Sequence, residues 1–288
     1  MDELQLYLLR YGEIGTKSLN IRKHFEKILI QNIERFFLSE EAEVITERKG
    51  RGRLFAYADP QYSYLFSRVF GIVSFSRAEK IRAELEDMKE KGKNFASEIK
   101  GSFAVRARRV GEHEFDSQDV EAEIGDIILD ENASLNVDLD DPDHTFYIEI
   151  RHSDAYIFKD IIYGPGGLPL SSQGKVAAYV ESKDDFIATW LLMRRGARPY
   201  VYTPGSSWVK RLNKWDPNLK IRETKSKRTF LDENFPKDVK GLVLGEDLQN
   251  LTSGHKDFLI FRPLIGLSQD RKNNFFRNIE KLEKNKNI

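Results

Sequence analysis

The stretch that decides the fold runs from Gly101 to Pro169, and it opens with the basic strand Ser102-Phe103-Ala104-Val105-Arg106-Ala107-Arg108-Arg109. Successive side chains of a strand point to opposite faces. One face of this strand is therefore apolar, and the other carries Arg106 and Arg108. Arginines behind an apolar face suit a protein that holds a phosphate backbone. A solvated edge strand with ordinary surface arginines has the same pattern, and charge alone favours that interpretation.

The rest of the stretch contains its parts in a distinctive order. Residues 112–117 lead into a helix, for which Ser117 is the expected N-cap. Strands over 145–151 and 155–160 follow, and the stretch closes on Tyr163-Gly164-Pro165-Gly166-Gly167-Leu168-Pro169. This order resembles the THUMP domain of the tRNA 4-thiouridine synthetases. The resemblance implies RNA binding, typically of the acceptor stem and 3′ end of tRNA.

The N-terminal third has the strand and helix order of a ferredoxin-like domain. Strands are expected over 4–9, 44–48, 53–57 and 71–75, with a long amphipathic helix from Ser18 to Phe37 and a short helix after Asp59-Pro60. The loop Tyr11-Gly12-Glu13-Ile14-Gly15 resembles the opening signature of the same family. Upstream of the arginine strand, Ile81, Leu85 and Met88 predict a further helix that ends near residues 91–94.

The C-terminal third alternates strands with helices, which predicts a doubly wound parallel sheet. The expected strands are 174–180, 198–202, 241–245 and 258–262. The fold class is thus α/β, with a ferredoxin-like α+β domain over 1–76, a THUMP α/β domain over 77–165 and a small Rossmann-like, PP-loop-type domain over 166–288. The Gly/Pro stretch 164–169 is the expected connector.

In the PP-loop family, the first turn of such a sheet reads Ser-Gly-Gly-x-Asp-Ser, and its backbone amides wrap the phosphates of ATP. Here the turn reads Glu181-Ser182-Lys183-Asp184-Asp185, without either glycine. A phosphate would meet carboxylates there instead of a nest of amides. The resemblance leaves a remnant nucleotide site, expected to be degenerate, at Tyr179, Val180, Ser182, Lys183, Asp184, Asp185, Tyr202 and Gly245. We predict no catalytic residue and no metal ligand.

The segment between Tyr202 and Gly241 looks shorter than in active relatives, with no helix pair. It interleaves basic residues with Trp208 and Trp215. Such residues can bind looped RNA through phosphate contacts and base stacking, or the tryptophans can pack against the sheet; the sequence leaves both open. The RNA-binding candidates over the whole chain are Lys17, Arg22, Lys23, Lys80, Arg82, Arg106, Arg108, Arg109, Lys210 and Arg211. A hairpin with Lys49, Arg51 and Arg53 adds a basic cluster that is more typical of a solvated turn.

Composition restricts the functions further. The chain has 46 basic and 46 acidic residues, so RNA binding has to rest on local patches. It has no cysteine, which excludes disulfides, thiolate metal sites and a persulfide carried on the chain. No apolar run approaches the roughly 20 residues that span a bilayer, and the N-terminus lacks a signal-peptide layout, so we expect a cytoplasmic protein.

Three functions remain open. The first is a tRNA-binding protein of the thiouridine synthetase family that has lost ATP binding, works beside an external sulfur-transfer or thiolation enzyme, and forms the homodimer that the resemblance implies. The second is an active tRNA sulfurtransferase that uses ATP and Mg²⁺ and takes sulfur from an outside donor. The third is a scaffold that does not bind RNA, for which Arg106 and Arg108 would be paired with carboxylates.

Overall fold

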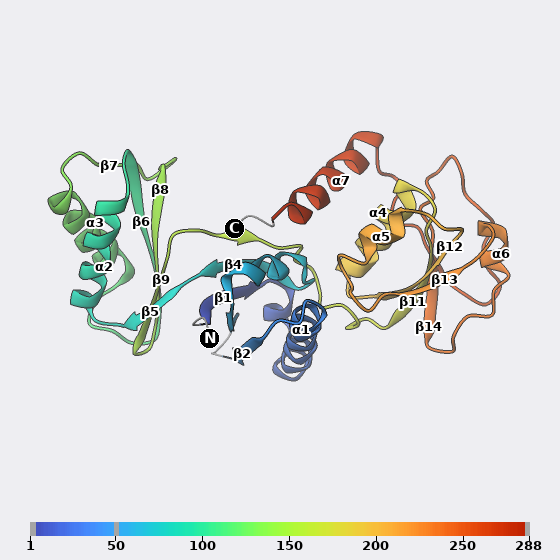
Figure 1. The fold of residues 1–288 in the computed structure, drawn as a ribbon, viewed down its shortest axis with the longest axis horizontal. Helices are drawn as coiled ribbons and strands as arrows, with labels where there is room; N and C mark the ends of the chain where they lie inside the picture. The colour runs from blue at the N-terminus through green and yellow to red at the C-terminus, as the bar shows by residue number, and fades with distance from the viewer. Residues whose placement is uncertain (1–3, 49–51, 286–288) are drawn as a thin grey trace. The chain divides into compact units, whose positions relative to one another are not determined.

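The computed structural model describes residues 4–48 and 52–285, and Figure 1 gives the element labels used below. Its strands form three five-stranded sheets, so the predicted α/β class is confirmed. One compact unit contains Leu9–Phe75 and the residues from Tyr163 onward, and the second contains Leu4–Leu8 and Ser76–Ile162. Lys49 and Arg51 of the predicted basic hairpin lie outside the described residues. None of the described helices has the length and apolar character needed to cross a bilayer.

The N-terminal sheet has the order β10-β4-β1-β3-β2. Its strands are β1 (Gln5–Tyr11), β2 (Val44–Arg48), β3 (Arg53–Ala58), β4 (Ile72–Arg77) and β10 (Ile162–Tyr163). After the 3-10 turn η1 (Glu13–Thr16), helix α1 (Leu19–Ser39) buries one stripe, which includes Phe25, Leu29 and Ile33. The short helix expected after Asp59 is the 3-10 helix η2 (Pro60–Arg68), and the Asp59 carboxylate accepts a hydrogen bond from the Gln61 amide at 2.9 Å. The predicted ferredoxin-like order is therefore present.

The middle sheet has the order β5-β9-β8-β6-β7. Its strands are β5 (Glu79–Arg82), β6 (Ser102–Val110), β7 (Asn136–Val137), β8 (His144–Arg151) and β9 (Asp154–Phe158). Helices α2 (Leu85–Glu98) and α3 (Ser117–Glu131) cover one face of this sheet (Figure 1). Phe103, Val105 and Ala107 belong to the core beneath the two helices, as the alternation predicted.

Two details of the middle sheet correct the sequence analysis. Ile81 lies on β5, outside the helix, and α2 continues to Glu98 because buried Phe95 and Ala96 extend its apolar stripe. The N-cap of α3 is Asp116, one residue before the expected Ser117. Its carboxylate accepts hydrogen bonds from the amides of Gln118 and Asp119 at 2.7 and 2.9 Å, and two bonds stabilise a helix start better than one.

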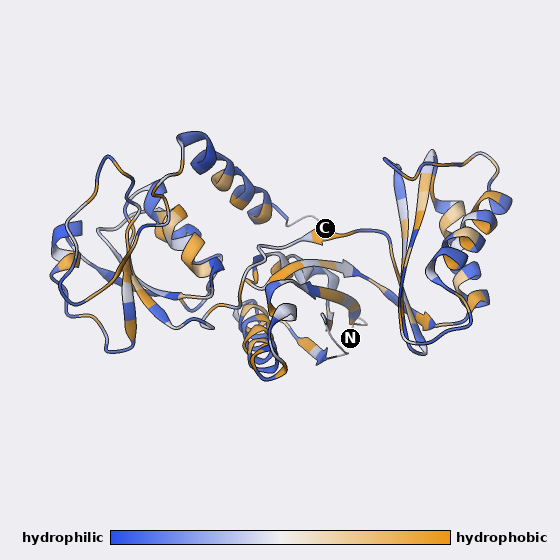
Figure 2. Cartoon of the chain, turned by 180° about the vertical axis from the view of Figure 1, so that it is seen from behind, coloured by the Kyte–Doolittle hydropathy of each residue, from blue (hydrophilic) through white to orange (hydrophobic). Residues whose placement is uncertain are grey.

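The C-terminal sheet has the order β13-β12-β11-β14-β15, and all neighbouring strands are parallel. Its strands are β11 (Lys175–Tyr179), β12 (Arg198–Thr203), β13 (Lys220–Glu223), β14 (Val239–Val243) and β15 (Ile260–Phe261). Helices α4 (Lys183–Arg194), α5 (Trp208–Leu212) and α7 (Gln269–Glu283) carry residues of the core on one face. Figure 2 shows α7 with both hydrophilic and hydrophobic residues, as expected for a docking helix with one apolar stripe.

An aromatic cluster around Tyr202, Phe230 and Phe235 covers the second face of this sheet, next to the short helix α6 (Lys227–Leu231). The segment between Tyr202 and Gly241 was expected to lack a helix pair, and this was wrong, because it contains α5 and α6 with five residues each. Strand β13 was also missed. All four of its residues are exposed, so the strand has no apolar alternation that could have been recognised.

The Gly/Pro stretch after β10 is fixed by hydrogen bonds. The amides of Gly164 and Gly166 donate to the carbonyls of Val73 and Ile72 at 2.9 and 2.8 Å. At Gly167, with φ +76°, a Cβ atom would lie 2.1 Å from the Arg194 carbonyl oxygen. Only glycine fits this close approach. The predicted connector is therefore an ordered part of its unit.

Candidate nucleic-acid interface and strand-end site

Arg106 and Arg108 lie on the face of the middle sheet opposite α2 and α3, whereas Arg109 lies on the helix side, beside the core residue Ile150. In the register with β8, Arg106 lies beside Tyr147 and Arg108 beside Glu149. The Arg106 guanidinium donates to the Leu139 carbonyl, Arg109 donates to the His113 carbonyl at 3.5 Å, and Arg108 is exposed. In the described part of the chain, none of these three arginines forms an ion pair with a carboxylate. The scaffold hypothesis required such pairs at Arg106 and Arg108.

The other candidates of the middle module are neutralised by neighbours. The Lys80 ammonium lies 3.0 Å from an Asp154 carboxylate oxygen. Arg82 forms a two-bond pair with Asp87, with both N···O distances 2.9 Å, and contacts Glu84 at 3.0 Å. Both cations are exposed, so these pairs are weak and reversible. Their positive charge is nevertheless compensated locally, unlike that of the β6 arginines.

The N-terminal candidates flank the start of α1. Lys17 and Lys23 are exposed, and neither has a carboxylate partner among residues 4–48 and 52–285. Arg22 lies 3.8 Å from the buried Glu26 carboxylate, which also accepts a hydrogen bond from the Tyr11 hydroxyl at 2.5 Å. Burial and this hydrogen bond raise the pKa of Tyr11 to about 12. Tyr11 therefore anchors the Tyr-Gly-Glu loop, and the two lysines remain available to a partner.

The cations of the C-terminal module have different surroundings. Lys210 is exposed, whereas Arg211 pairs with Glu283 at 2.8 Å and lies over the Phe276 ring at 4.6 Å. Trp215 is fully buried, and Trp208 packs against Phe186 with ring centroids 5.6 Å apart. The question that the sequence left open is thus decided for Trp215. It packs in the core and offers no surface for base stacking.

The carboxyl ends of β11 and β14 form the strand-end site, where nucleotides bind in sheets of this kind. The sequence predicted that no nest of amides would exist there. Three backbone amides do converge, and they surround the carboxylate of Asp185. It accepts hydrogen bonds from the amides of Ser182 at 2.9 Å, Glu181 at 3.2 Å and Gly245 at 3.1 Å, and from the Ser182 hydroxyl at 2.8 Å. The chain's own anion thus occupies these donors.

Two residues make this arrangement possible. Ser182 caps α4, and its hydroxyl also accepts a hydrogen bond from the Asp185 amide, which completes a capping box. Gly245 lies against the first turn of α4, and a Cβ atom there would be only 2.4 Å from the Asp185 nitrogen. Asp185 itself is 5% exposed. Its carboxylate is therefore shielded from solvent and fixed by hydrogen bonds within the chain.

Helix α7 adds a second set of charges to the strand-end site. Lys272, which is buried, donates to Asp184 at 2.6 Å and to Asp247 at 3.0 Å. The hydrogen bond from Lys272 is the largest effect that lowers the pKa of Asp247. Lys183, the one cation expected to attract phosphate, instead donates to Asn273 of α7 at 3.1 Å and lies over the Phe276 ring. It does not join the amides around Asp185.

The remaining predicted residues of this site are core residues. Tyr179 is buried and donates to Glu181 at 2.6 Å, and burial and this hydrogen bond raise the pKa of Tyr179. The Val180 amide donates to the Tyr202 carbonyl at 2.8 Å, and the Tyr202 ring packs against Phe230. These residues lie at the predicted place in the sheet, and their polar groups are satisfied within the chain.

The sequence analysis missed Glu246 and Lys272. Glu246 is fully buried and accepts from Arg262 at 2.8 Å and from the Thr252 amide at 3.3 Å, with Lys227 at 3.4 Å. Its position directly after Gly245, at the end of a predicted strand, was a usable signal. Lys272 is one of several lysines in the last helix, and nothing in the sequence marked it as buried.

Comparisons with known proteins agree with this architecture. Residues 6–76 match the domain family described as the ThiI ferredoxin-like domain, and residues 82–160 match the THUMP domain family. A probable tRNA sulfurtransferase of Saccharolobus islandicus is 31% identical, and the match covers 90% of this chain and 82% of that protein. This chain belongs to the tRNA sulfurtransferase family. That alignment runs over 315 positions, more than the 288 residues here, so the relative carries residues without a counterpart in this chain.

Other family members are longer. The probable tRNA sulfurtransferase of Methanothermobacter thermautotrophicus is 36% identical over 68% of this chain but only 51% of its own length. The tRNA sulfurtransferase of Pyrobaculum aerophilum is 39% identical over 67% of this chain and 40% of its own length. The chain thus spans about half the length of these relatives.

Two solved structures share the fold. PH1313 from Pyrococcus horikoshii is 28% identical with a TM-score of 0.81, and the match covers 96% of this chain and 99% of that one. A 4-thiouridine synthetase, described as an RNA complex with bound ATP, is 22% identical with a TM-score of 0.72 over 97% of this chain and 85% of that one. The second likeness concerns the fold alone.

Proposed function

We propose that this family member binds tRNA through its THUMP module and has lost ATP binding at the strand-end site of its C-terminal sheet. One observation carries the second part. The backbone amides of Glu181, Ser182 and Gly245 already donate to the Asp185 carboxylate. A phosphate at the same amides would have to displace that carboxylate and lie beside it, with like charges in contact.

The RNA-binding part rests on the charges that the chain leaves uncompensated. Arg106 and Arg108 share one face of β6, Arg109 lies near the strand's end on the other face, and none of them has a carboxylate partner among the described residues. Arginines presented on a sheet can contact successive phosphates and 2′-hydroxyls of RNA. Lys17 and Lys23 add exposed positive charge at the start of α1. Relatives named tRNA sulfurtransferase make tRNA the expected RNA.

The proposal extends to partners. The acceptor stem and 3′ end of tRNA are the expected ligand of the THUMP module. Since the chain has no cysteine, sulfur would have to come from a separate sulfur-transfer or thiolation enzyme. A homodimer in the cytoplasm is the expected setting, and light scattering at several protein concentrations would test the dimer.

Calorimetric titration of the purified protein with ATP and Mg²⁺, and separately with tRNA, tests the proposal. We expect salt-sensitive binding of tRNA and no heat of ATP binding, with or without saturating tRNA. Micromolar ATP binding would contradict the loss of the nucleotide site and favour an active sulfurtransferase. Absence of tRNA binding at low salt would contradict the proposal that the THUMP module binds tRNA.

A further inference from the structure

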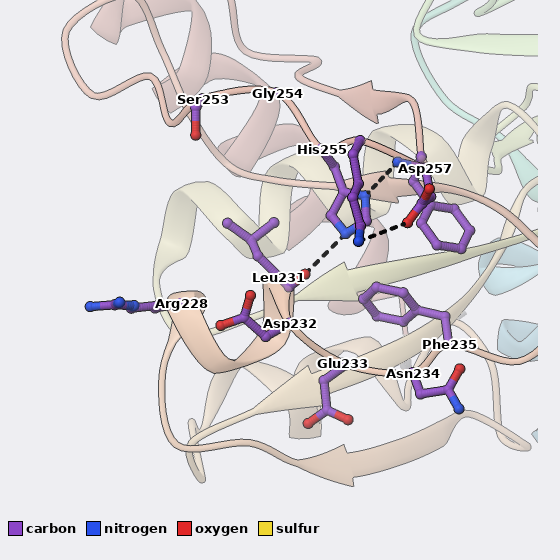
Figure 3. Close-up of a pocket in the computed structure, with 12 residues that line it drawn as sticks. Arg228, Leu231, Asp232, Glu233, Asn234, Phe235, Ser253, Gly254, His255 and Asp257 are labelled. Carbon is purple, nitrogen blue, oxygen red and sulfur yellow. Dashed lines mark hydrogen bonds and ion pairs between the residues drawn. The ribbon is translucent and has the colours of Figure 1, made fainter.

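The C-terminal module contains a cavity of about 720 Å³ that the proposed function does not use. One wall is formed by residues 228–235, from α6 and the loop after it, and the other by residues 253–258, which lead to β15. Both walls are labelled in Figure 3. A cavity of this size holds a ligand as large as a nucleotide.

The floor of this cavity is aromatic and fixed. Phe235 and Phe258 meet edge to face with centroids 5.3 Å apart, and the His255 ring lies 5.3 Å from Phe258. The Asp257 amide donates to His255 Nδ1 at 3.1 Å, so Nε2 carries the hydrogen and donates to the Leu231 carbonyl at 3.0 Å (Figure 3). Both ring nitrogens of His255 are thus engaged within the chain, and neither is free to bind a ligand. Phe235 is 7% exposed and packed edge to face by Tyr202, Phe230 and Phe258, so the partly exposed rings of His255 and Phe258 are the ones on which a base can stack.

The rim of the cavity carries polar groups of both signs. Asp232, Glu233 and Asn234 follow one another directly after α6, with Arg228 and Lys256 as the cations. In the described part of the chain, the side chains of Asp232, Glu233 and Asn234 have no hydrogen-bond or ion-pair partner. These three side chains thus differ from the charges of the strand-end site, which are paired within the chain, and from Lys256, which lies 4.0 Å from the Asp257 carboxylate.

We infer that this cavity binds a guanine nucleotide, either free or as an unpaired residue of RNA. Guanine presents two adjacent N–H donors on its Watson–Crick edge, which a carboxylate can accept together. Uracil presents one such donor, and adenine and cytosine present one amino group each. Arg228, which has no carboxylate partner among the described residues, is the group that would attract the phosphate; Lys256 is already beside Asp257. For an RNA ligand, the inference rests on the proposed function; for a free nucleotide, it does not.

Titration of the full chain with guanosine 5′-monophosphate, monitored by calorimetry, tests the inference. We expect this nucleotide to bind at least about tenfold more tightly than uridine 5′-monophosphate. The double variant Asp232→Asn/Glu233→Gln should lose about tenfold in guanosine affinity and most of the base preference. Glu223→Gln, which removes an exposed carboxylate from β13 outside the cavity, is the matched control and should bind like the wild type.

Equal affinity for the two nucleotides, or an unchanged affinity in the double variant, would overturn the inference. If the nucleotide does bind as expected, a competition experiment identifies its source. If the cavity holds an unpaired guanosine of tRNA, guanosine 5′-monophosphate weakens tRNA binding; if it holds a free nucleotide, tRNA binding is unaffected. The variant Arg106→Ala/Arg108→Ala/Arg109→Ala should keep its nucleotide affinity, so failure of the RNA-binding proposal and failure of this inference are distinguishable.

Discussion

The middle sheet and the C-terminal sheet both carry clustered charges. Those along β6 of the middle sheet lack carboxylate partners within the described chain, whereas those at the strand ends of the C-terminal sheet are paired within the chain. Along β6, Arg106, Arg108 and Arg109 lack carboxylate partners among the described residues. At the carboxyl ends of β11 and β14, the chain compensates its own charges: amides surround Asp185, Lys272 joins Asp184 to Asp247, and Arg262 pairs with Glu246.

The difference follows from desolvation. A buried charge is costly unless hydrogen bonds or an opposite charge satisfy it. Glu246, Lys272 and Asp185 are all nearly inaccessible to solvent, so their partners have to come from the chain. The β6 arginines are accessible to water, which solvates their charge when no ligand is bound. We therefore expect the charges without internal partners, and not the most densely charged regions, to be the ones that bind a ligand.

The largest expected effect removes the uncompensated charges of β6. The variant Arg106→Ala/Arg108→Ala/Arg109→Ala should lower tRNA affinity by about 100-fold at low salt. Each arginine that contacts a phosphate releases counterions from the RNA, and the variant loses this favourable contribution. The slope of log Kd against log salt should fall by about 2. Fluorescence anisotropy with labelled tRNA at several salt concentrations measures both.

A charge-matched control sharpens this test. Lys89→Ala/Lys91→Ala/Lys159→Ala removes three ion-paired positive charges, two from α2 on the opposite side of the same sheet and Lys159, which pairs with Glu98 at the end of that helix. Lys89 and Lys91 are ion-paired there. If this variant loses as much tRNA affinity as the arginine variant, binding depends on total charge, and the contrast between compensated and uncompensated charges is wrong.

The next effect concerns the anion in the strand-end site. Asp185→Ala should lower the free energy of unfolding of the C-terminal module by about 3 kcal/mol, because it removes a helix cap and leaves buried amides without acceptors. All three tryptophans of the chain lie in this module, so their fluorescence during urea unfolding reports on it. Ser182→Ala removes one hydroxyl of the same cap and should cost about 1 kcal/mol. Equal losses in the two variants would contradict the role assigned to the carboxylate.

A smaller loss is expected from Lys272→Met. This change leaves two carboxylates close together without their shared cation, which should destabilise the module by about 2 kcal/mol, less than for a fully buried pair. Urea unfolding followed by tryptophan fluorescence measures the loss. The triple variant Lys272→Met/Asp184→Asn/Asp247→Asn should recover most of it. No recovery would mean that packing of the lysine stem, and not charge, carries the effect.

The same contrast predicts a dependence on pH. The hydrogen bond from Lys272 lowers the pKa of Asp247; burial raises the pKa of Glu246, but hydrogen bonds from Arg262 and Thr252 outweigh burial and lower it. Lowered folded-state values stabilise the module above the unfolded-state pKa values, about 4 for these groups, and this stability is lost as the pH falls through the folded-state values. The urea concentration at the unfolding midpoint of the C-terminal module should therefore decrease as the pH is lowered below about 5. Asp247→Asn should flatten that fall, and an unchanged profile would exclude Asp247 as a source.

The smallest effect is expected at a compensated surface cation. Arg82→Ala removes a charge that Asp87 and Glu84 already balance, so tRNA affinity should change less than about threefold in the anisotropy assay. A loss comparable to that of a single β6 arginine would show that Arg82 leaves its acidic partners to bind RNA.

The regular elements with an apolar period were predictable from the sequence. The alternation in β6 placed Phe103 and Val105 in the core, and the spacing along α1 placed Leu29 and Ile33. Strand β13 was not predictable, since all its side chains are exposed. Ile81 was assigned to a helix because it lies four residues before Leu85, although Ile81 belongs to β5 and a bend after Arg82 separates this strand from α2.

The strand-end site was predictable in place but not in chemistry. The residues 181–185 were located correctly at the end of β11, yet the carboxylates there were expected to leave the turn without a nest of amides. The sequence does not show which way a carboxylate points, and Asp185 turns inward to the amides. Lys272 contacts Asp184 across 88 positions of the chain, and no local pattern reports such a contact.

The hydrogen bonds between β4 and the Gly164–Gly166 segment determine how late in translation the N-terminal sheet can be completed. β4 lies at residues 72–77, whereas its neighbour β10 and the glycines after it follow the whole middle module. On the ribosome, the nascent N-terminal sheet therefore exposes one edge until roughly 90 further residues have been added. An open strand edge is a site of non-native pairing. The whole middle module therefore has to be synthesised before the chain itself can close that edge.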